Sequence, residues 1–122
     1  MKGQDLVAFI TGNRLVELMH EYDKYEADIS SREVNLVRVG VFLAYVTGVY
    51  DTLSFAFRTP DGMTVGQICA VVSKYLKNHP EMWRESADLL VVEALREAFP
   101  LNKLSNNKES QIIKQIDRKD VL

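Results

Sequence analysis

The fold is decided by the stretch TVGQICAVVSKYL, residues 64–76. Its apolar residues recur at intervals of three and four, which places them on one face of an α-helix. Thr64 and Gln67 fit a capping box, in which each side chain accepts the backbone N–H of the other residue. The stretch therefore predicts a helix over residues 64–78. Cys69 lies on its apolar face, so we expect a buried thiol; a reactive thiol is the alternative.

Two neighbouring segments extend this pattern on either side. Residues 13–22 carry apolar side chains at helical spacing after Thr11 or Asn13, either of which can cap a helix. Residues 80–98 begin with Pro80, which suits the first helical position, and end before Pro100. Both segments are predicted helices that present one apolar face to the core.

The longest predicted helix covers residues 31–57 and is apolar on more than one face, which is typical of a central helix. Ser30 or Ser31 can cap its start, and Ser30 with Glu33 fits a second capping box. Gly40, Ala44 and Gly48 recur every four residues, which favours close packing of another helix; a bend is the alternative. We expect Asp51 to be half-buried and to bond between helices.

No segment has the alternating pattern of a strand. The sequence therefore predicts an all-α protein, a compact bundle of four to five helices with a long central helix. Residues 1–102 form this helical domain. Residues 103–122 form a polar tail, either a frayed helix or disordered.

Composition excludes several classes of protein. The chain has 122 residues, of which 47% are apolar and 26% charged, as in ordinary globular domains. A net charge of −2 argues against nucleic-acid binding through bulk positive charge. One cysteine excludes an intrachain disulfide and a cysteine zinc cluster. Two histidines leave little for a metal site, and no cofactor or catalytic motif is found, so we expect no metal, no cofactor and no enzymatic activity.

The chain shows no sign of membrane insertion in its sequence. Its longest uncharged run within the first hundred residues, residues 39–50, is shorter than the roughly 20 residues of a spanning helix. The N-terminus has no apolar leader segment. Two expectations remain open: a cytoplasmic protein, or one whose signal peptide has been removed.

Several segments, taken in order, resemble one protein family. They are FITGNRL (9–15), AYVTGVYD (44–51), MTVGQ (63–67), VVSKYL (71–76), HPE (79–81), ADLLV (87–91), AL (94–95) and AFP (98–100). Together they are similar to the Rap/Tai-type immunity proteins of bacterial type VI secretion. Family members usually carry cysteines near residues 41–43 and 57–59, where this chain has none.

The resemblance implies an all-helical, commonly dimeric periplasmic protein without catalytic activity. Such a protein binds and blocks a secreted effector toxin, here a cell-wall amidase, by filling its substrate groove. The alternative is a helical adaptor or scaffold without a toxin.

Two turns are the expected binding elements, residues 58–63 and 78–84, because both are short and flanked by helices. The candidate partner-binding residues are Arg58, Pro60, Asp61, Gly62, Met63, His79, Glu81 and Trp83. Trp83 is a core residue or a binding anchor, and His79 serves the helix joint or pairs with Glu81 as acid and base. Five acidic residues in residues 17–28 form a solvated surface or, alternatively, a patch for a basic partner.

Overall fold

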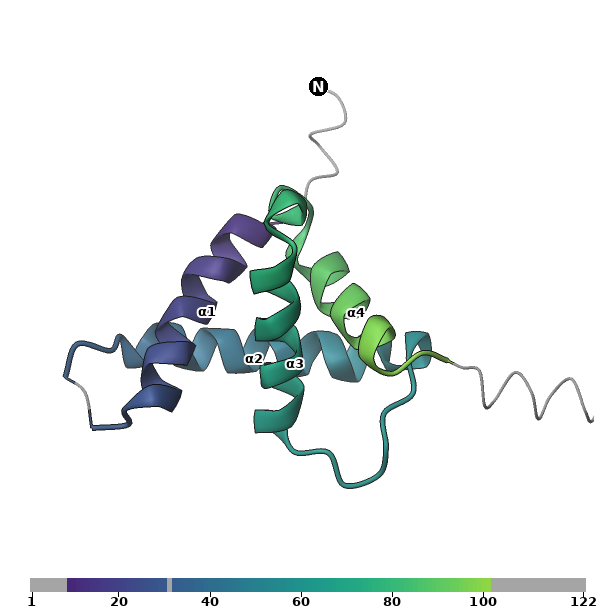
Figure 1. The fold of residues 1–122 in the computed structure, drawn as a ribbon, viewed down its shortest axis with the longest axis horizontal. Coiled ribbons are helices and arrows are strands. Elements are labelled where there is room, and N and C mark those ends of the chain that lie inside the picture. Colours follow the sequence, from purple (N-terminus) through teal and green to yellow (C-terminus); the bar gives the residue numbers. More distant parts are fainter. Residues whose placement is uncertain (1–8, 31, 102–122) are drawn as a thin grey trace, which may run out of the picture.

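The computed structural model describes residues 9–30 and 32–101 (Figure 1). Four α-helices follow one another: α1 (Gly12–Ala27), α2 (Leu36–Leu53), α3 (Val65–Asn78) and α4 (Ala87–Ala98). Short 3₁₀ turns follow α2 and α3, at Ser54–Ala56 and Pro80–Met82. Thr11 and Ser86 form an isolated bridge, and the described ranges contain no strand. The predicted all-α fold is confirmed, whereas the boundary at residue 102 and the tail lie outside the described residues.

The helix starts agree with the sequence for two of the four helices, α1 and α3. The predicted start at Pro80 is wrong, because Pro80 begins the 3₁₀ turn Pro80–Met82 and α4 begins at Ala87. The Thr11 hydroxyl accepts the Arg14 N–H at 3.3 Å. Both hydrogen bonds of the Thr64 capping box are present, at 3.1 and 2.8 Å. A side chain at each start thus satisfies N–H groups that have no partner inside the helix.

The predicted start of the long helix is wrong. The helix α2 begins at Leu36, and the side chain of Asn35 caps it by accepting the Arg38 N–H at 3.2 Å. Ser30 does not cap a helix, because its N–H and hydroxyl both donate to the Asp28 carboxylate, at 3.1 and 2.7 Å. The aspartate thus closes a local turn that competes with helix initiation. The predicted end of the first helix is also wrong, because α1 extends to Ala27, beyond residue 22.

The three helices α1, α3 and α4 all contact α2 and lie on one side of it, as Figure 1 shows. The side of α2 that faces them carries Val39, Phe42, Val46 and Val49, spaced by three and four residues. Tyr22 of α1 packs against Phe42 with ring centroids 5.1 Å apart. The fully buried side chains of the core are Leu15, Leu18, Met19, Phe42, Val46, Cys69, Val72, Leu76, Leu90, Val91 and Leu95.

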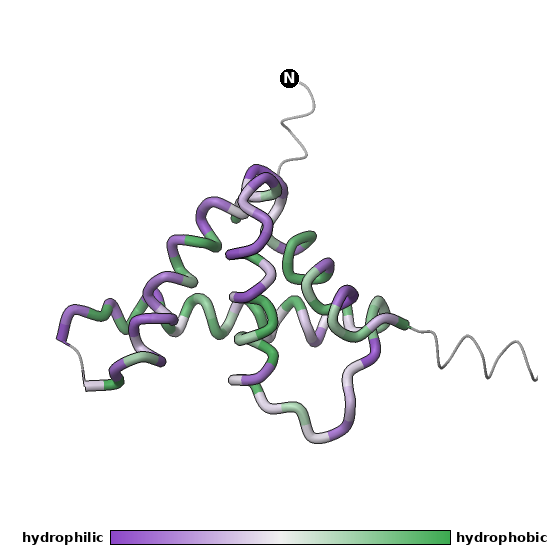
Figure 2. The backbone as a smooth tube through the Cα atoms, viewed as in Figure 1, coloured by the Kyte–Doolittle hydropathy of each residue, from purple (hydrophilic) through white to green (hydrophobic). Residues whose placement is uncertain are grey.

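The opposite side of α2 is bare in the described chain. A Cβ placed on Gly40 or Gly48 would meet no atom within 4 Å, so no helix of the described residues packs there. The expected close approach across the small residues is therefore wrong within residues 9–30 and 32–101. Asp51 is exposed, not half-buried as expected, because it lies on this bare side. Figure 2 shows mostly apolar and neutral colours along α2, in contrast to the many polar positions of α1.

One segment of the described chain, Leu36–Ala56, is long and apolar enough to cross a membrane by length and composition. This segment is longer than the uncharged run of residues 39–50, because it includes Arg38 and Asp51. Core helices of water-soluble proteins meet the same criterion, so the observation is weak by itself. In the most apolar stretch of 18 residues within this segment, 17% is buried, so most of α2 is exposed.

Candidate functional site

Cys69 is fully buried, as expected, and burial together with the nearby charge of Glu26 raises the pKa of its thiol to about 11. The thiol is therefore protonated at neutral pH and is no nucleophile. Among residues 9–30 and 32–101, no group of three or more metal-ligating side chains converges on one point.

His79 serves the joint between α3 and α4. Its Nδ1 donates to the Tyr75 carbonyl at 2.8 Å, and its ring stacks on the Tyr75 ring with centroids 4.0 Å apart. Its Nε2 lies 3.9 Å from a carboxylate oxygen of Glu97, not of Glu81. Of the two hypotheses for His79, the structure supports the structural one, in which the ring packs and hydrogen-bonds at the C-terminal end of α3.

The turn of residues 58–63 is held at both ends. The Arg58 N–H donates to the Phe99 carbonyl at 3.0 Å, which ties the turn to the end of α4. The hydroxyls of Thr59 and Tyr50 lie 2.6 Å apart, which ties it to α2. On one side of the turn Phe57 is buried, and on the other the capping box of Thr64 starts α3. The ends are therefore fixed to three helices.

The tip of this turn projects into solvent. Pro60, Asp61 and Gly62 are exposed, whereas Met63 is half-buried and packs against the core. Gly62 has φ of +85°, a conformation that residues with a Cβ rarely adopt. Pro60 restricts its own φ, so the tip has few conformations to lose when it is bound.

The joint of residues 78–84 is anchored differently. The Trp83 indole N–H donates to the Leu76 carbonyl at 2.8 Å, and its half-buried ring packs on the core. The Gly12 N–H donates to the Glu85 carbonyl at 2.7 Å, and the Ala87 N–H donates to the Ile10 carbonyl at 2.9 Å. Trp83 thus holds the joint in place, while Glu81 is exposed.

The two candidate turns lie at opposite ends of α3, as Figure 1 shows. A helix of 14 residues is about 21 Å long, so the two turns are separated by about that distance. The structure therefore does not bring the eight candidate residues together. A narrow groove in a partner would receive one of the two turns.

The acidic residues of α1 are largely engaged in contacts within the fold. Glu21 pairs with Lys24 at 3.0 Å, and Asp23 pairs with Lys77 at 2.8 Å. Asp23 also accepts the hydroxyl of Ser73, which is itself 4% exposed, at 3.0 Å. Asp23 therefore ties α1 to α3, whereas Glu17, Glu26 and Asp28 are exposed, as expected of a solvated surface.

Sequence reasoning missed the anchors of the exposed turn, namely the contacts of Arg58 with Phe99 and of Thr59 with Tyr50. No local motif encodes them, because each joins residues that only the packing of the helices brings together. The bare side of α2 agrees with the apolar surplus of the long helix in the sequence, since an apolar surface on more than one face exceeds what three neighbours on one side can cover.

Comparison with known proteins bears on these observations. The family model described as Rap1a immunity proteins matches residues 11–101, a region that includes all four helices and both turns. The chain has no match among the curated proteins or the solved structures. The family match agrees with the resemblance found in the sequence and supports an immunity role. The chain belongs to the family of Rap1a immunity proteins.

Proposed function

We propose that this protein neutralises a type VI secretion effector, a peptidoglycan amidase, by occupying its substrate groove. The family match supports the immunity role. The inhibition needs no chemistry from the inhibitor, because a peptide-cleaving groove that is filled admits no substrate.

The observation that carries the mechanism is the exposed tip at Pro60, Asp61 and Gly62 between fixed ends. A tight inhibitor needs a projecting element that loses little conformational freedom on binding. The bond of Arg58 to Phe99 and the Gly62 conformation supply this rigidity. A standard inhibitor interface buries about 800 Å² on each partner, so the flanking ends of α3 and α4 contribute as well.

The joint of residues 78–84 is the second candidate for the inserted element. Its exposed residues Pro80 and Glu81 project at the far end of α3. Its largest side chain, Trp83, already donates its N–H to Leu76 and is half-buried, so it is less available as an anchor. We therefore assign insertion to residues 58–63.

The proposed setting is the periplasm, where an amidase effector meets the cell wall, and the proposed assembly is a homodimer. Both follow from the resemblance of the chain to type VI immunity proteins. A cytoplasmic location and a helical adaptor without a toxin are the corresponding alternatives.

The experiment is to co-purify the protein with the product of the neighbouring gene and to titrate peptidoglycan hydrolysis. We expect a complex of defined stoichiometry and complete loss of hydrolysis at the equivalence point. A stable complex in which hydrolysis continues would contradict the steric mechanism and favour the adaptor. If the inhibited effector belonged to another enzymatic class, the steric mechanism would stand and the assignment of the toxin as an amidase would be wrong.

A further inference from the structure

Two adjoining grooves lie where α4 meets the bare side of α2. The larger, of about 420 Å³, is lined mainly by the apolar side chains of Leu53, Phe55, Ala56, Leu89 and Val92. The second, of about 410 Å³, continues it along α2 past Ala44, Tyr45 and Gly48. Leu53 and Asp88 line both grooves, so the two form one surface, which we call the outer groove.

The outer groove combines exposed apolar side chains with one carboxylate. Phe55 is 75% exposed and Leu89 39%, and monomeric proteins rarely leave contiguous apolar patches uncovered. Asp88 is half-buried, and its carboxylate accepts the N–H of the adjoining Leu89 at 2.8 Å. Within residues 9–30 and 32–101 this carboxylate forms no ion pair. The outer groove therefore fits an apolar segment that also carries lysine or arginine.

We propose that the outer groove binds residues 103–122 of the same chain, called the tail here, which lie outside the described residues. The apolar residues of the tail are Leu104, Ile112, Ile113, Ile116, Val121 and Leu122. Segments that stay solvated are typically poor in β-branched apolar residues. The basic residues Lys103, Lys108, Lys114, Arg118 and Lys119 outnumber the acidic residues Glu109, Asp117 and Asp120. This positive excess complements Asp88 and the exposed Asp51 near the end of α2.

The chain that leads into the tail leaves the fold beside the outer groove. The Arg58 N–H donates to the Phe99 carbonyl at 3.0 Å, which holds the end of α4 next to the segment that follows α2. Figure 1 shows the end of α4 close to the 3₁₀ turn Ser54–Ala56. Ala56, two residues before Arg58, lines the groove. Since extended chain covers about 3.3 Å per residue, a few residues after Leu101 suffice to reach it.

The length and spacing of the tail suit this surface. Twenty residues would span about 30 Å as a helix, against about 27 Å for the 18 residues of α2. Ile112, Ile113 and Ile116 are spaced so that a helix would present them on one face.

Covalent attachment favours the tail over a separate molecule as the occupant. A short tether gives an effective concentration in the millimolar range, so a small contact is populated within one chain. Two separate molecules need a surface of roughly 800 Å² on each partner for a standard interface, which α2 alone does not offer.

The inference is independent of toxin neutralisation. The tail lies beyond residues 11–101, the region that the family model matches. The proposed inhibitory tip at Pro60, Asp61 and Gly62 does not line the outer groove. Docking of the tail and binding of the effector are therefore tested by substitutions at different residues.

The first test removes the apolar residues of the tail in the full chain. One variant combines Ile112→Ser, Ile113→Ser and Ile116→Ser, and the matched control combines Gln111→Ser and Gln115→Ser. Trypsin cuts after the basic residues of the tail, and mass spectrometry follows each cut. We expect cleavage in the isoleucine variant to be at least tenfold faster than in the original protein and the control. Synthetic peptides of residues 103–122 with the same substitutions give the intrinsic cleavage rates.

The same variants report on the groove itself. Anilinonaphthalene sulfonate fluoresces on exposed apolar surfaces, so we expect a severalfold higher signal from the isoleucine variant than from the control. Equal cleavage rates after correction for the peptides, together with equal dye fluorescence, would overturn the proposal.

A second test changes the groove and leaves the tail intact. Leu89→Ser removes an exposed apolar side chain of the groove, and Val65→Ser is the matched control at an exposed valine of α3. We expect Leu89→Ser to speed cleavage of the tail severalfold and Val65→Ser to leave the rate unchanged. Circular dichroism checks that both variants keep their helices. Loss of effector binding in Leu89→Ser with unchanged cleavage of the tail would assign the groove to the effector and overturn the proposal.

A carbodiimide cross-link identifies the occupant directly, because it joins a carboxylate to a lysine in contact with it. At micromolar concentration we expect Asp88 or Asp51 to be joined to a lysine of the tail within a chain of 13.9 kDa. A product of twice that mass, joined through Asp88, would assign the groove to a second copy and overturn the proposal. Either contrary result would leave toxin neutralisation standing, since inhibition of the effector is measured separately.

Discussion

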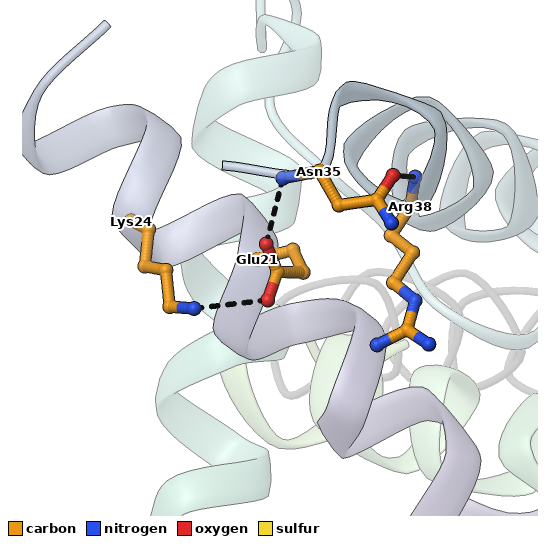
Figure 3. Close-up of polar contacts among 4 residues, drawn as sticks. All are labelled: Glu21, Lys24, Asn35 and Arg38. Carbon is orange, nitrogen blue, oxygen red and sulfur yellow. Dashed lines mark hydrogen bonds and ion pairs between the residues drawn. The ribbon is translucent and has the colours of Figure 1, made fainter. Parts of the chain in front are cut away.

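The carboxylate of Glu21 in α1 accepts the backbone N–H of Asn35, the N-cap residue of α2, at 2.8 Å (Figure 3). Its second oxygen accepts Lys24 Nζ at 3.0 Å. The Asn35 side chain in turn accepts the Arg38 N–H. One acidic side chain thus joins α1 to the start of α2, and these contacts hold the pKa of Glu21 below its ordinary value of 4.5, with the Asn35 hydrogen bond as the largest cause.

This arrangement predicts an acid-sensitive contribution to stability. Because the pKa of Glu21 is lowered by folding, its stabilising effect is fully present above pH 4.5 and is lost as the pH falls through the lower folded pKa. We expect Glu21→Gln to be less stable than the original protein at pH 7 and to lose less on acidification. Urea unfolding from pH 7 to below pH 4.5 measures both effects.

Glu17→Gln is the matched control for this prediction. Glu17 lies on the same helix, is exposed, and pairs with Arg14 of α1 at 2.7 Å. An equal loss of acid sensitivity in both variants would show that the effect comes from net charge and not from the contact of Glu21 with Asn35.

A second prediction concerns Gly12, the first residue of α1. A Cβ there would lie 2.5 Å from Leu90 Cδ1 and 2.5 Å from the Trp83 carbonyl oxygen. Since that oxygen is backbone, it does not move aside easily, and overpacking of this kind costs about 1–3 kcal/mol. We expect Gly12→Ala to lower the melting temperature by roughly 4–8 °C for each kcal/mol lost.

Gly66→Ala is the control for Gly12, because a Cβ at Gly66 finds its nearest neighbour at 3.8 Å. An alanine inside a helix is favoured over glycine by roughly 0.5–1 kcal/mol, so this variant should keep or raise the melting temperature. If Gly12→Ala were equally stable, the close approach of α1 to residues 83–90 would be wrong.

The sequence predicted most of what local patterns control. The Thr64 capping box and the buried position of Cys69 follow from spacing within a few residues, and both are confirmed. The start of α2 was mispredicted because Ser30 and Glu33 fit a capping motif as well as many true caps do. The structure instead uses Asn35, whose backbone is held by Glu21 from another helix. That contact depends on how α1 and α2 pack, which no local motif states.

The candidate site shows the same division. The turn chemistry of Pro60 and Gly62 was readable from the sequence, and the positive φ of Gly62 agrees with it. The anchoring of Arg58 by the Phe99 carbonyl was not readable, because it requires α4 to return beside the end of α2. Whether the turn contacts a toxin depends on a partner whose surface the sequence does not contain.

A third prediction separates the two roles considered for Trp83. If Trp83 holds the joint, Trp83→Phe removes its hydrogen bond to the Leu76 carbonyl and costs about 1–2 kcal/mol of unfolding free energy. Its effect on toxin affinity should be small. Urea unfolding followed by circular dichroism gives the first quantity, and calorimetric titration with the effector gives the second. A large loss of affinity with unchanged stability would make Trp83 a binding anchor.

The last prediction tests the inserted turn against the acidic surface of α1. Asp61 is at the exposed tip of residues 58–63, and Glu26 is exposed on α1, so Asp61→Lys and Glu26→Lys make the same change of charge at the two places. Asp23 is unsuitable for this comparison because it bonds to Ser73 and Lys77.

Groups buried at the centre of an interface act mainly on dissociation, whereas charges at its rim act mainly on association and on salt dependence. We therefore expect Asp61→Lys to raise the dissociation rate of the effector complex at least tenfold, about 1.4 kcal/mol. Glu26→Lys should change the association rate by a smaller factor that vanishes at high salt. Surface plasmon resonance at two ionic strengths measures both rates, and the reverse pattern would move the inhibitory surface from the turn to α1.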